Sequence, residues 1–215
     1  MLELDELRIE AESCTRCPLA ATRTNVVFGV GEADSDLMFV GEAPGRNEDL
    51  QGVPFVGKAG QLLDRLLDEV GIPRDTVYIA NVLKCRPPNN RDPQPEEIDA
   101  CKGYLRQQIR LIRPRVVVTL GNFSTKLLLN TTTGITRLRG RAYPWWLGAW
   151  LIPTFHPAAA LRGGPRVADA MREDFALMRR SLDHPPVPEG GEQAGEREEG
   201  APAEPAEPYQ ARLWT

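Results

Sequence analysis

Short apolar runs rich in β-branched residues alternate along this chain with longer segments of helical periodicity, and this alternation constrains the fold more than any other feature. Apolar side chains recur at helical spacing in residues 60–70 and 96–112. The apolar runs themselves occupy residues 37–40, 77–80, 116–120 and 151–153. This order is typical of a parallel sheet that is covered by helices on both faces. We therefore expect an α/β fold, a three-layer αβα sandwich around a central, mainly parallel, four-stranded sheet.

One helical segment shows clearly which of its faces is buried. Polar side chains fill the rest of its surface, and its apolar stripe consists of Leu62, Leu63, Leu66, Leu67 and Val70. We expect this stripe to pack in the core.

Glycine and polar residues follow three of the apolar runs. The stretch from Gly41 to Gly45 follows the first run, Asn81 ends the second, and His156 comes three residues after Pro153. Ligands of open α/β sheets bind in the crevice at the carboxyl ends of the strands. The sequence therefore predicts a site where these three segments meet.

The charge of the chain is divided unevenly. Residues 183–215 hold eight acidic and two basic side chains, so residues 1–182 carry a net charge of +2 although the whole chain carries −4. The stretch 183–208 is so rich in Pro, Glu, Gly and Ala that it buries too little apolar surface to offset its ordering entropy. We expect one folded domain over 1–182 and a disordered acidic linker over 183–208.

The composition also bears on location. The sequence holds no apolar run of the roughly 20 residues that span a bilayer. Its acidic N-terminal stretch lacks the basic-then-apolar layout of a signal peptide. We expect a cytoplasmic, monomeric protein without a membrane partner.

Four cysteines form a candidate metal site, because disulfides are rare in a reducing compartment. Cys14 and Cys17 form a Cys-x-x-Cys pair, and Cys85 and Cys101 follow later in the chain. Four thiolates suit either tetrahedral zinc or an iron–sulfur cluster, and spacing alone does not decide between the two. Four unrelated structural cysteines remain an alternative, since free cysteine is often buried. A redox pair is disfavoured because Cys14 and Cys17 precede the first predicted strand.

Four motifs and the four cysteines together resemble the family 4 uracil-DNA glycosylases of bacteria and archaea. The motifs are GEAPGRNED from Gly41, VPFVGKAGQLL from Val53, NVLKCRPPNNRDP from Asn81 and FHPAAALR from Phe155. They occur in the family's order between about residues 14 and 182. The resemblance implies a DNA repair hydrolase that flips uracil out of DNA and hydrolyses its N-glycosidic bond, leaving an abasic site in single- or double-stranded DNA. It also implies a 4Fe-4S cluster on Cys14, Cys17, Cys85 and Cys101, with zinc as the alternative.

Two other functions fit part of the pattern. A non-catalytic iron–sulfur or zinc module that binds DNA lesions needs the cysteines and basic loops but not the remaining motif residues. A glycosylase of the same fold for another base is the second alternative.

The resemblance assigns base recognition to Asn81 and Phe55. The Asn81 amide can donate to uracil O4 and accept from N3–H, a pairing that cytosine would reverse. Asn81 could instead cap a turn. Phe55 could be ordinary core, but the resemblance makes it the aromatic platform under the flipped base.

The candidate catalytic residues are His156, which lies in a motif of the resembled family, and Glu42 and Glu48, which are the carboxylates near the predicted site. A neutral His156 can donate a hydrogen bond to uracil O2 as negative charge develops there. Either glutamate could anchor the attacking water or stabilise the oxocarbenium-like sugar. Ala43 occupies the position at which the best-known uracil glycosylases have a water-positioning Asp. The turn around the base is expected to include Gly41, Glu42, Ala43, Gly45 and Glu48.

Basic side chains and one leucine are predicted to grip DNA. Arg137, Arg139 and Arg141 alternate, which on an extended segment would place three guanidiniums on one face. Leu161 could enter the minor groove to fill the gap left by the flipped base. The predicted DNA-binding set is Lys84, Arg86, Arg91, Arg137, Arg139, Leu161 and Arg162.

The last seven residues, 209–215, restore apolar side chains after the acidic linker. Gln210, Leu213 and Trp214 have the Gln-x-x-Leu-aromatic layout that resembles the short peptides by which bacterial repair proteins dock on the sliding clamp. We expect this peptide to bind the sliding clamp.

Overall fold

The computed structural model describes residues 2–184. The predicted linker 183–208, apart from its first two residues, and the predicted clamp-binding peptide 209–215 lie outside the described residues. Within the described part, none of the helices has the length and apolar character that crossing a membrane requires.

A central sheet forms the middle layer and has the strand order β2-β1-β3-β5-β4. The first four of these strands run parallel, and β4 pairs antiparallel with β5. The strands are β1 Leu37–Gly41, β2 Tyr78–Asn81, β3 Val116–Leu120, β4 Tyr143–Pro144 and β5 Trp150–Thr154. All four predicted strands are confirmed. The fifth strand has two residues, which is too short for an alternation of side chains to reveal it.

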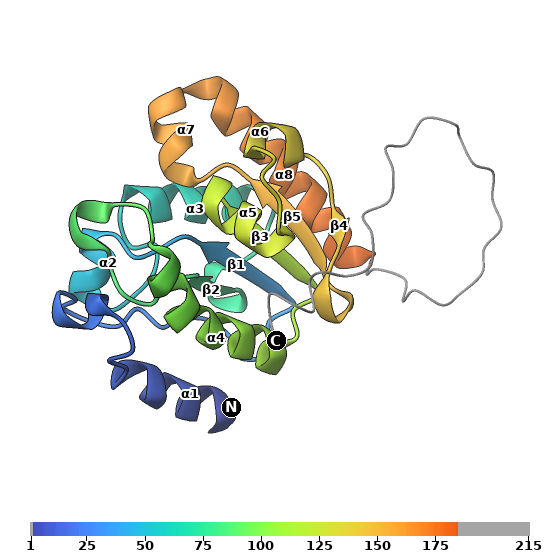
Figure 1. Cartoon of the computed structure of the whole chain (residues 1–215). Helices are drawn as coiled ribbons and strands as arrows, with labels where there is room; N and C mark the ends of the chain where they lie inside the picture. Colours follow the sequence, from blue (N-terminus) through green and yellow to red (C-terminus); the bar gives the residue numbers. More distant parts are fainter. Residues whose placement is uncertain (1, 185–215) are drawn as a thin grey trace.

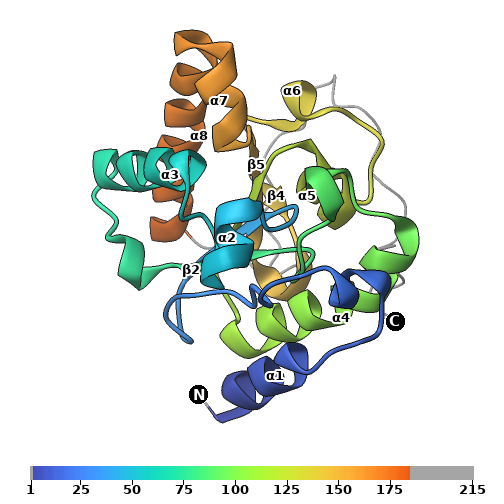
Figure 2. The same cartoon turned by 90° about the vertical axis from the view of Figure 1, so that its left-hand side faces the viewer.

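Helices cover both faces of the sheet (Figures 1 and 2). Alternate strand residues point to opposite faces, so Met38 and Val40 pack in one cluster while Leu37 and Phe39 pack in the other. The first cluster includes side chains of α1 Leu2–Glu12, α4 Pro95–Ile112 and α5 Asn122–Leu129. The second includes side chains of α3 Lys58–Glu69, α7 Pro157–Gly163 and α8 Pro165–Asp183. The predicted three-layer sandwich is confirmed.

The remaining elements are short and lie in connections. They are α2 Arg46–Gln51, α6 Ile135–Leu138 and the 3-10 turns Pro18–Ala21, Arg74–Thr76, Pro88–Asn90 and Trp146–Gly148.

Helix α3 is built as its sequence predicts. Leu62, Leu63, Leu66 and Leu67 are buried against the sheet, and Val70 caps the helix and is partly buried. At its other end, Gly57 and Lys58 start the helix directly after the segment that carries Phe55. The core packing of α3 thus positions one wall of the site.

Candidate functional site

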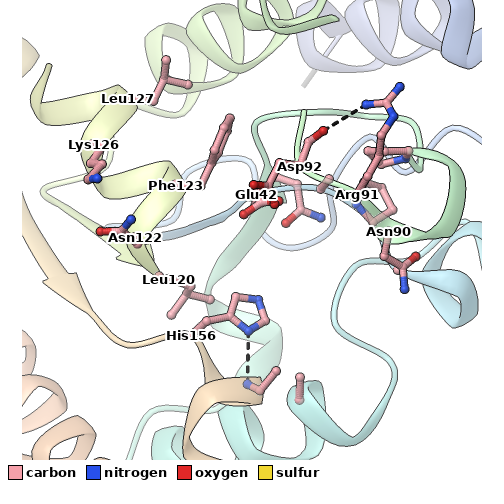
Figure 3. A pocket seen from close by; sticks show the side chains of 18 of the residues that line it. Glu42, Asn90, Arg91, Asp92, Leu120, Asn122, Phe123, Lys126, Leu127 and His156 are labelled. Carbon is pink, nitrogen blue, oxygen red and sulfur yellow. Dashed lines mark hydrogen bonds between the residues drawn. The ribbon is translucent and has the colours of Figure 1, made fainter. Parts of the chain in front are cut away.

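The segments that follow the parallel strands converge on one cavity of about 1010 Å³. Glu42 comes from the end of β1, Asn81 ends β2, Leu120 ends β3, and His156 follows β5. Figure 3 shows His156 at one edge of the cavity, between a wall formed by α5 and a wall formed by residues 90–92. The convergence predicted from strand order is therefore present, because parallel strands all end at one edge of the sheet.

Asn81 is buried, with 2% of its surface exposed, and lines the cavity. Its backbone carbonyl accepts a hydrogen bond of 2.8 Å from Lys84 Nζ. Within residues 2–184 no group forms a hydrogen bond with the Asn81 side-chain amide, so this amide does not cap a turn. A Cβ on Gly41 would lie 2.3 Å from Asn81 Oδ1 and 2.9 Å from the Phe55 ring. The missing side chain of Gly41 thus leaves room for the side chains of Asn81 and Phe55.

Phe55 lines the cavity in a strained backbone conformation with φ of 55°. Arg74 donates hydrogen bonds of 3.1 Å to the carbonyls of both Pro54 and Phe55, and also pairs with Asp64 of α3. The Phe55 ring lies 5.7 Å from the His156 ring, measured between centroids. These contacts hold the aromatic face of Phe55 in place against the strain.

Glu48 braces the segment that carries Phe55. Its Oε1 accepts hydrogen bonds from the backbone N–H groups of Val56, at 3.1 Å, and Gly57, at 3.2 Å. A Cβ on Gly45 would lie 2.7 Å from Glu48 Oε2, so glycine at this position lets the carboxylate reach the segment. One oxygen of Glu48 is therefore committed to the protein.

Glu42 is half-buried and lies near a second carboxylate, that of Asp92. Burial raises the pKa of Glu42, and the nearby Asp92 carboxylate raises it further. Figure 3 shows both residues on the same side of the cavity, where Arg91 donates to the Asp92 carbonyl at 2.9 Å. Glu42 therefore has a higher proton affinity than an ordinary surface glutamate. Ala43 and Gly45 also line the cavity.

His156 is held in one tautomer by its own helix. It caps α7, because its Nδ1 accepts a hydrogen bond of 3.1 Å from the backbone N–H of Ala158. The pKa of His156 is lowered to about 4, mainly by burial and in addition by the Arg162 guanidinium, while Glu48 opposes the shift. A neutral ring that accepts at Nδ1 carries its proton at Nε2. His156 thus offers a single N–H donor without needing an acidic solution.

Gly121, at the start of α5, lies against His156. It has φ of +99°, and a Cβ there would lie 3.0 Å from the His156 Cβ. A larger residue would both strain this turn and displace the histidine.

The four cysteines gather in one region beside α1 and α4. All four are free, and electrostatic interactions link Cys85 with Cys14 and Cys17, and Cys101 with Cys17 and Cys85. Among residues 2–184, no three His, Cys, Asp or Glu side chains are arranged to hold a metal ion. The four cysteines are therefore neighbours in the described part of the chain.

N–H groups surround these sulfurs. Arg16 Nε approaches Cys14 Sγ at 3.4 Å, Arg23 Nη1 approaches Cys85 Sγ at 3.4 Å, and the Lys84 backbone N–H approaches Cys101 Sγ at 3.2 Å. Such donors stabilise anionic, metal-bound sulfur. The donor chemistry fits a thiolate-ligated group.

Comparison with known proteins agrees with this arrangement. A model of the Uracil DNA glycosylase superfamily matches residues 28–177. The type-4 uracil-DNA glycosylase of Saccharolobus solfataricus is 44% identical over 195 residues, covering 87% of this chain and 90% of that protein. That of Archaeoglobus fulgidus is 47% identical over 182 residues, covering 81% and 91%. That of Thermotoga maritima is 51% identical over 162 residues, covering 74% and 84%. The chain belongs to the type-4 uracil-DNA glycosylases.

One residue of the predicted DNA-binding set in this type-4 chain is wrongly assigned. Lys84 has only 1% of its surface exposed, and its Nζ donates to Asn81 O and Gln108 Oε1 inside the protein. Burial lowers the pKa of Lys84 to about 7, with Cys101 and Cys85 opposing the shift. Because its amino group faces the interior, Lys84 does not reach a phosphate.

The predicted extended face of three arginines is also wrong. Residues 135–138 form helix α6 instead of a strand, and Arg139 caps its end. The Arg139 guanidinium binds both oxygens of Asp174 at 2.9 Å and the carbonyl of Ala170 on α8. Asp174 in turn accepts a 2.7 Å hydrogen bond from Thr154 at the end of β5. Arg139 therefore ties α6 to α8 and β5, while Arg137 and Arg141 are exposed.

The other predicted DNA-binding residues lie at or near the cavity mouth. Arg91 and Arg162 line the cavity, and Leu161 is 48% exposed on α7. Arg91 also pairs with the buried Glu97 of α4, and Arg86 bonds Asn90 at 2.7 Å. These four residues and the exposed Arg137 remain candidates for DNA contact.

The cavity has lining residues that the motifs did not indicate. Asp92 lies in the motif that begins at Asn81, where a carboxylate directly after Arg91 is the signal that could have indicated it. Four further lining residues lie on α5, whose sequence gives no hint that it borders a site: Asn122, Phe123, Lys126 and Leu127.

Proposed function

We propose that the protein is a DNA repair enzyme, a monofunctional hydrolase that flips uracil out of DNA and cleaves its N-glycosidic bond, leaving an abasic site. The observation that carries this proposal is the convergence of Phe55, Asn81 and His156 on one cavity at the strand ends. A module that only binds lesions has no use for this combination of an amide, an aromatic face and a neutral N–H donor.

Base recognition is assigned to Asn81 and Phe55. The side-chain amide of Asn81 donates to uracil O4 and accepts from N3–H, whereas cytosine presents the opposite pattern of donor and acceptor. The flipped base lies on Phe55, whose backbone is held by Arg74 and whose segment is braced by Glu48. A mismatched base leaves a buried amide unpaired, at a cost of about 1–3 kcal/mol.

His156 stabilises the departing base. Cleavage leaves negative charge on the uracil, and Nε2–H of His156 donates to O2 as that charge develops. The hydrogen bond from Ala158 fixes the tautomer that this requires. Backbone N–H groups of the Glu42–Gly45 turn, except at Pro44, which has none, add further donors.

The attacking water is assigned jointly to Glu42 and Glu48. Burial raises the pKa of Glu42, and a more basic carboxylate accepts a proton from water more readily. Glu48 has one oxygen bound to the Phe55 segment, which leaves Oε2 to face the sugar. Either negative charge also stabilises the oxocarbenium-like sugar.

DNA is contacted by Arg86, Arg91, Arg137 and Arg162, while Leu161 enters the minor groove and fills the gap left by the flipped base. Lys84 and Arg139 are not part of this surface. The substrate is uracil-containing DNA, single- or double-stranded.

We further propose that Cys14, Cys17, Cys85 and Cys101 hold a 4Fe-4S cluster, with zinc as the alternative. The support is four grouped free thiols with N–H donors aimed at three of them. The cluster braces the N-terminal segment against α4 and the loop after β2. Free thiols suit the reducing cytoplasm in which we place the enzyme.

For the end of the chain, we propose that residues 209–215 bind the sliding clamp. The support is the sequence alone, in which Gln210, Leu213 and Trp214 follow the acidic stretch 183–208. A linker of this length would leave the enzyme free to search nearby DNA.

The test is excision from an oligonucleotide with one uracil, followed by alkali to cut the abasic site. Strand cleavage is expected with uracil, and parallel substrates with hypoxanthine or a mismatched thymine address the alternative of another base. Asn81→Asp is expected to lower uracil excision by orders of magnitude, because a carboxylate repels O4. Binding without excision would favour the lesion-binding module and overturn the proposal.

A further inference from the structure

Lys84 is a buried basic residue that the proposed chemistry does not use. It follows β2 by three residues, and 1% of its surface is exposed. Burial of a lysine is unfavourable unless the amino group is satisfied. Its Nζ donates to Asn81 O at 2.8 Å and to Gln108 Oε1 at 2.6 Å, and it lies 5.9 Å from the centre of the Phe28 ring.

Gln108 of α4 extends this contact into a network. Its Nε2 donates to Phe28 O at 2.9 Å and to Tyr78 Oη at 3.0 Å, and Gln108 is fully buried. Both ends of the Gln108 amide are therefore committed, so its carbonyl has one orientation. The amide fixes where the Lys84 amino group can lie, and α4 thereby reaches the last residue of β2.

The network ends at the peptide group of Asn81, the residue whose side chain faces the cavity. The following backbone is held as well, because Val82 N–H donates to Gly41 O and Leu83 N–H donates to Glu42 O, both at 3.0 Å. The side chain of Asn81 has no hydrogen bond of its own within residues 2–184. Its direction is therefore set by its backbone and by the space above Gly41.

We propose that Lys84 and Gln108 are positioning residues, which hold the backbone of Asn81 so that its side-chain amide meets the edge of the flipped base. The inference rests on the proposed role of Asn81 in reading uracil. Neither residue touches the base. Their effect is on the geometry of recognition, where a displacement of about 1 Å is costly.

The same residue connects this network to the cysteines. The backbone N–H of Lys84 donates to Cys101 Sγ at 3.2 Å, and Cys85 is the next residue in the chain. A variant of Lys84 is therefore checked for iron content as well as activity, and Gln108 offers a second variant that leaves the neighbours of Cys85 unchanged.

The experiment is a double-mutant cycle on the full chain with uracil-containing DNA. Lys84→Met keeps the length of the side chain and removes its donor, and Asn81→Ala removes the amide. Each single variant is expected to lower kcat/KM, Lys84→Met by about 10- to 100-fold. If Lys84 acts through Asn81, the double variant is expected to be no worse than Asn81→Ala within about threefold. Independent roles would multiply the two losses.

Binding to DNA that already contains an abasic site separates positioning from collapse of the fold. This product has no base for Asn81 to read, so Lys84→Met is expected to bind it within about twofold of the original chain. Gln108→Leu is expected to behave like Lys84→Met in both assays. Lys102→Met on α4 is the matched control, because Lys102 is partly exposed and, among the described residues, forms an ion pair only with Asp99.

The outcomes are distinct. Full excision by Asn81→Ala would refute the proposed reading of the base and this inference with it. Loss of excision by Asn81→Ala, combined with multiplied losses in the double variant, would overturn the inference alone. If both Lys84→Met and Gln108→Leu lose iron or abasic-site binding, the network is structural and the inference is wrong.

Discussion

At the scale of single residues, His156 shows how one local hydrogen bond decides what a side chain can do. Because Nδ1 accepts from Ala158, the proton of the neutral ring is at Nε2, on the side available to a ligand. The capping role and the proposed catalytic role therefore support each other.

The first prediction concerns the titration of His156. Its pKa is lowered to about 4, so the ring is expected to stay neutral from pH 8 to about pH 5. As the pH falls, the histidine is protonated earlier in the unfolded chain, where its pKa is about 6.5, than in the folded chain. The stability contributed by the neutral ring is thus complete above about pH 6.5 and is lost as the pH falls towards 4. NMR of the two imidazoles, assigned with His184→Asn, measures this. A His156 that titrates near 6.5 would contradict the neutral donor.

At the scale of elements, the close packing of α3 on the Phe55 segment is required for the site. A Cβ on Gly60 would lie 1.7 Å from the Phe55 carbonyl oxygen, so a side chain there cannot be accommodated without movement. The helix thus presses directly on a residue with a strained backbone.

The second prediction compares two helical glycines. Gly60→Ala is expected to lower the free energy of unfolding by about 1–3 kcal/mol and to reduce excision by displacing Phe55. Gly103 lies in the middle of α4, and a Cβ there would meet no atom of another element within 4 Å. Gly103→Ala is therefore expected to raise the free energy of unfolding by about 0.5–1 kcal/mol. Urea unfolding measures both. Equal effects at the two positions would show that the contact with Phe55 is unimportant.

The third prediction concerns two arginines that differ in environment although they are two residues apart. Arg139→Ala leaves the buried Asp174 without its partner, and we expect a loss of about 3–5 kcal/mol in the free energy of unfolding. Arg137→Ala removes an exposed side chain and is expected to change stability by no more than about 0.5 kcal/mol. Arg137→Ala is instead expected to weaken DNA binding. A stable Arg139→Ala protein with a DNA-binding defect would restore the original assignment.

At the scale of the whole molecule, the cysteines join segments that are distant in the sequence. Cys14 and Cys17 follow α1, Cys85 lies in the loop after β2, and Cys101 is on α4. A group bound to all four would link the N-terminal helix to the layer that supports Asn81.

The fourth prediction follows from this link. The purified protein is expected to be brown, with broad absorption near ~400 nm and bound iron. Cys17→Ser is expected to lose iron and to lower the Tm by about 5 °C or more, because the bound group stabilises only the folded chain. Ser13→Ala, at an exposed position, is the control. A colourless, active protein with stoichiometric zinc would contradict the assignment of a 4Fe-4S cluster.

The sequence by itself determined the layers, the four long strands and the edge of the sheet at which the site forms. These features follow from local patterns. The spacing at which apolar side chains recur shows which face of a helix or strand is buried, whichever element packs against that face. It also identified the motif residues around the cavity, through their order at the strand ends and their resemblance to a family.

Only the tertiary structure decided which way the long side chains point. Lys84 meets Gln108 24 residues later, and Arg139 meets Asp174 35 residues later, so nothing near either residue distinguishes it from an exposed cation. The strained φ of Phe55 and the tautomer of His156 are likewise set by their partners. A local pattern records whether a residue is polar, but whether that polarity meets water, another buried group or DNA depends on the elements that pack around it.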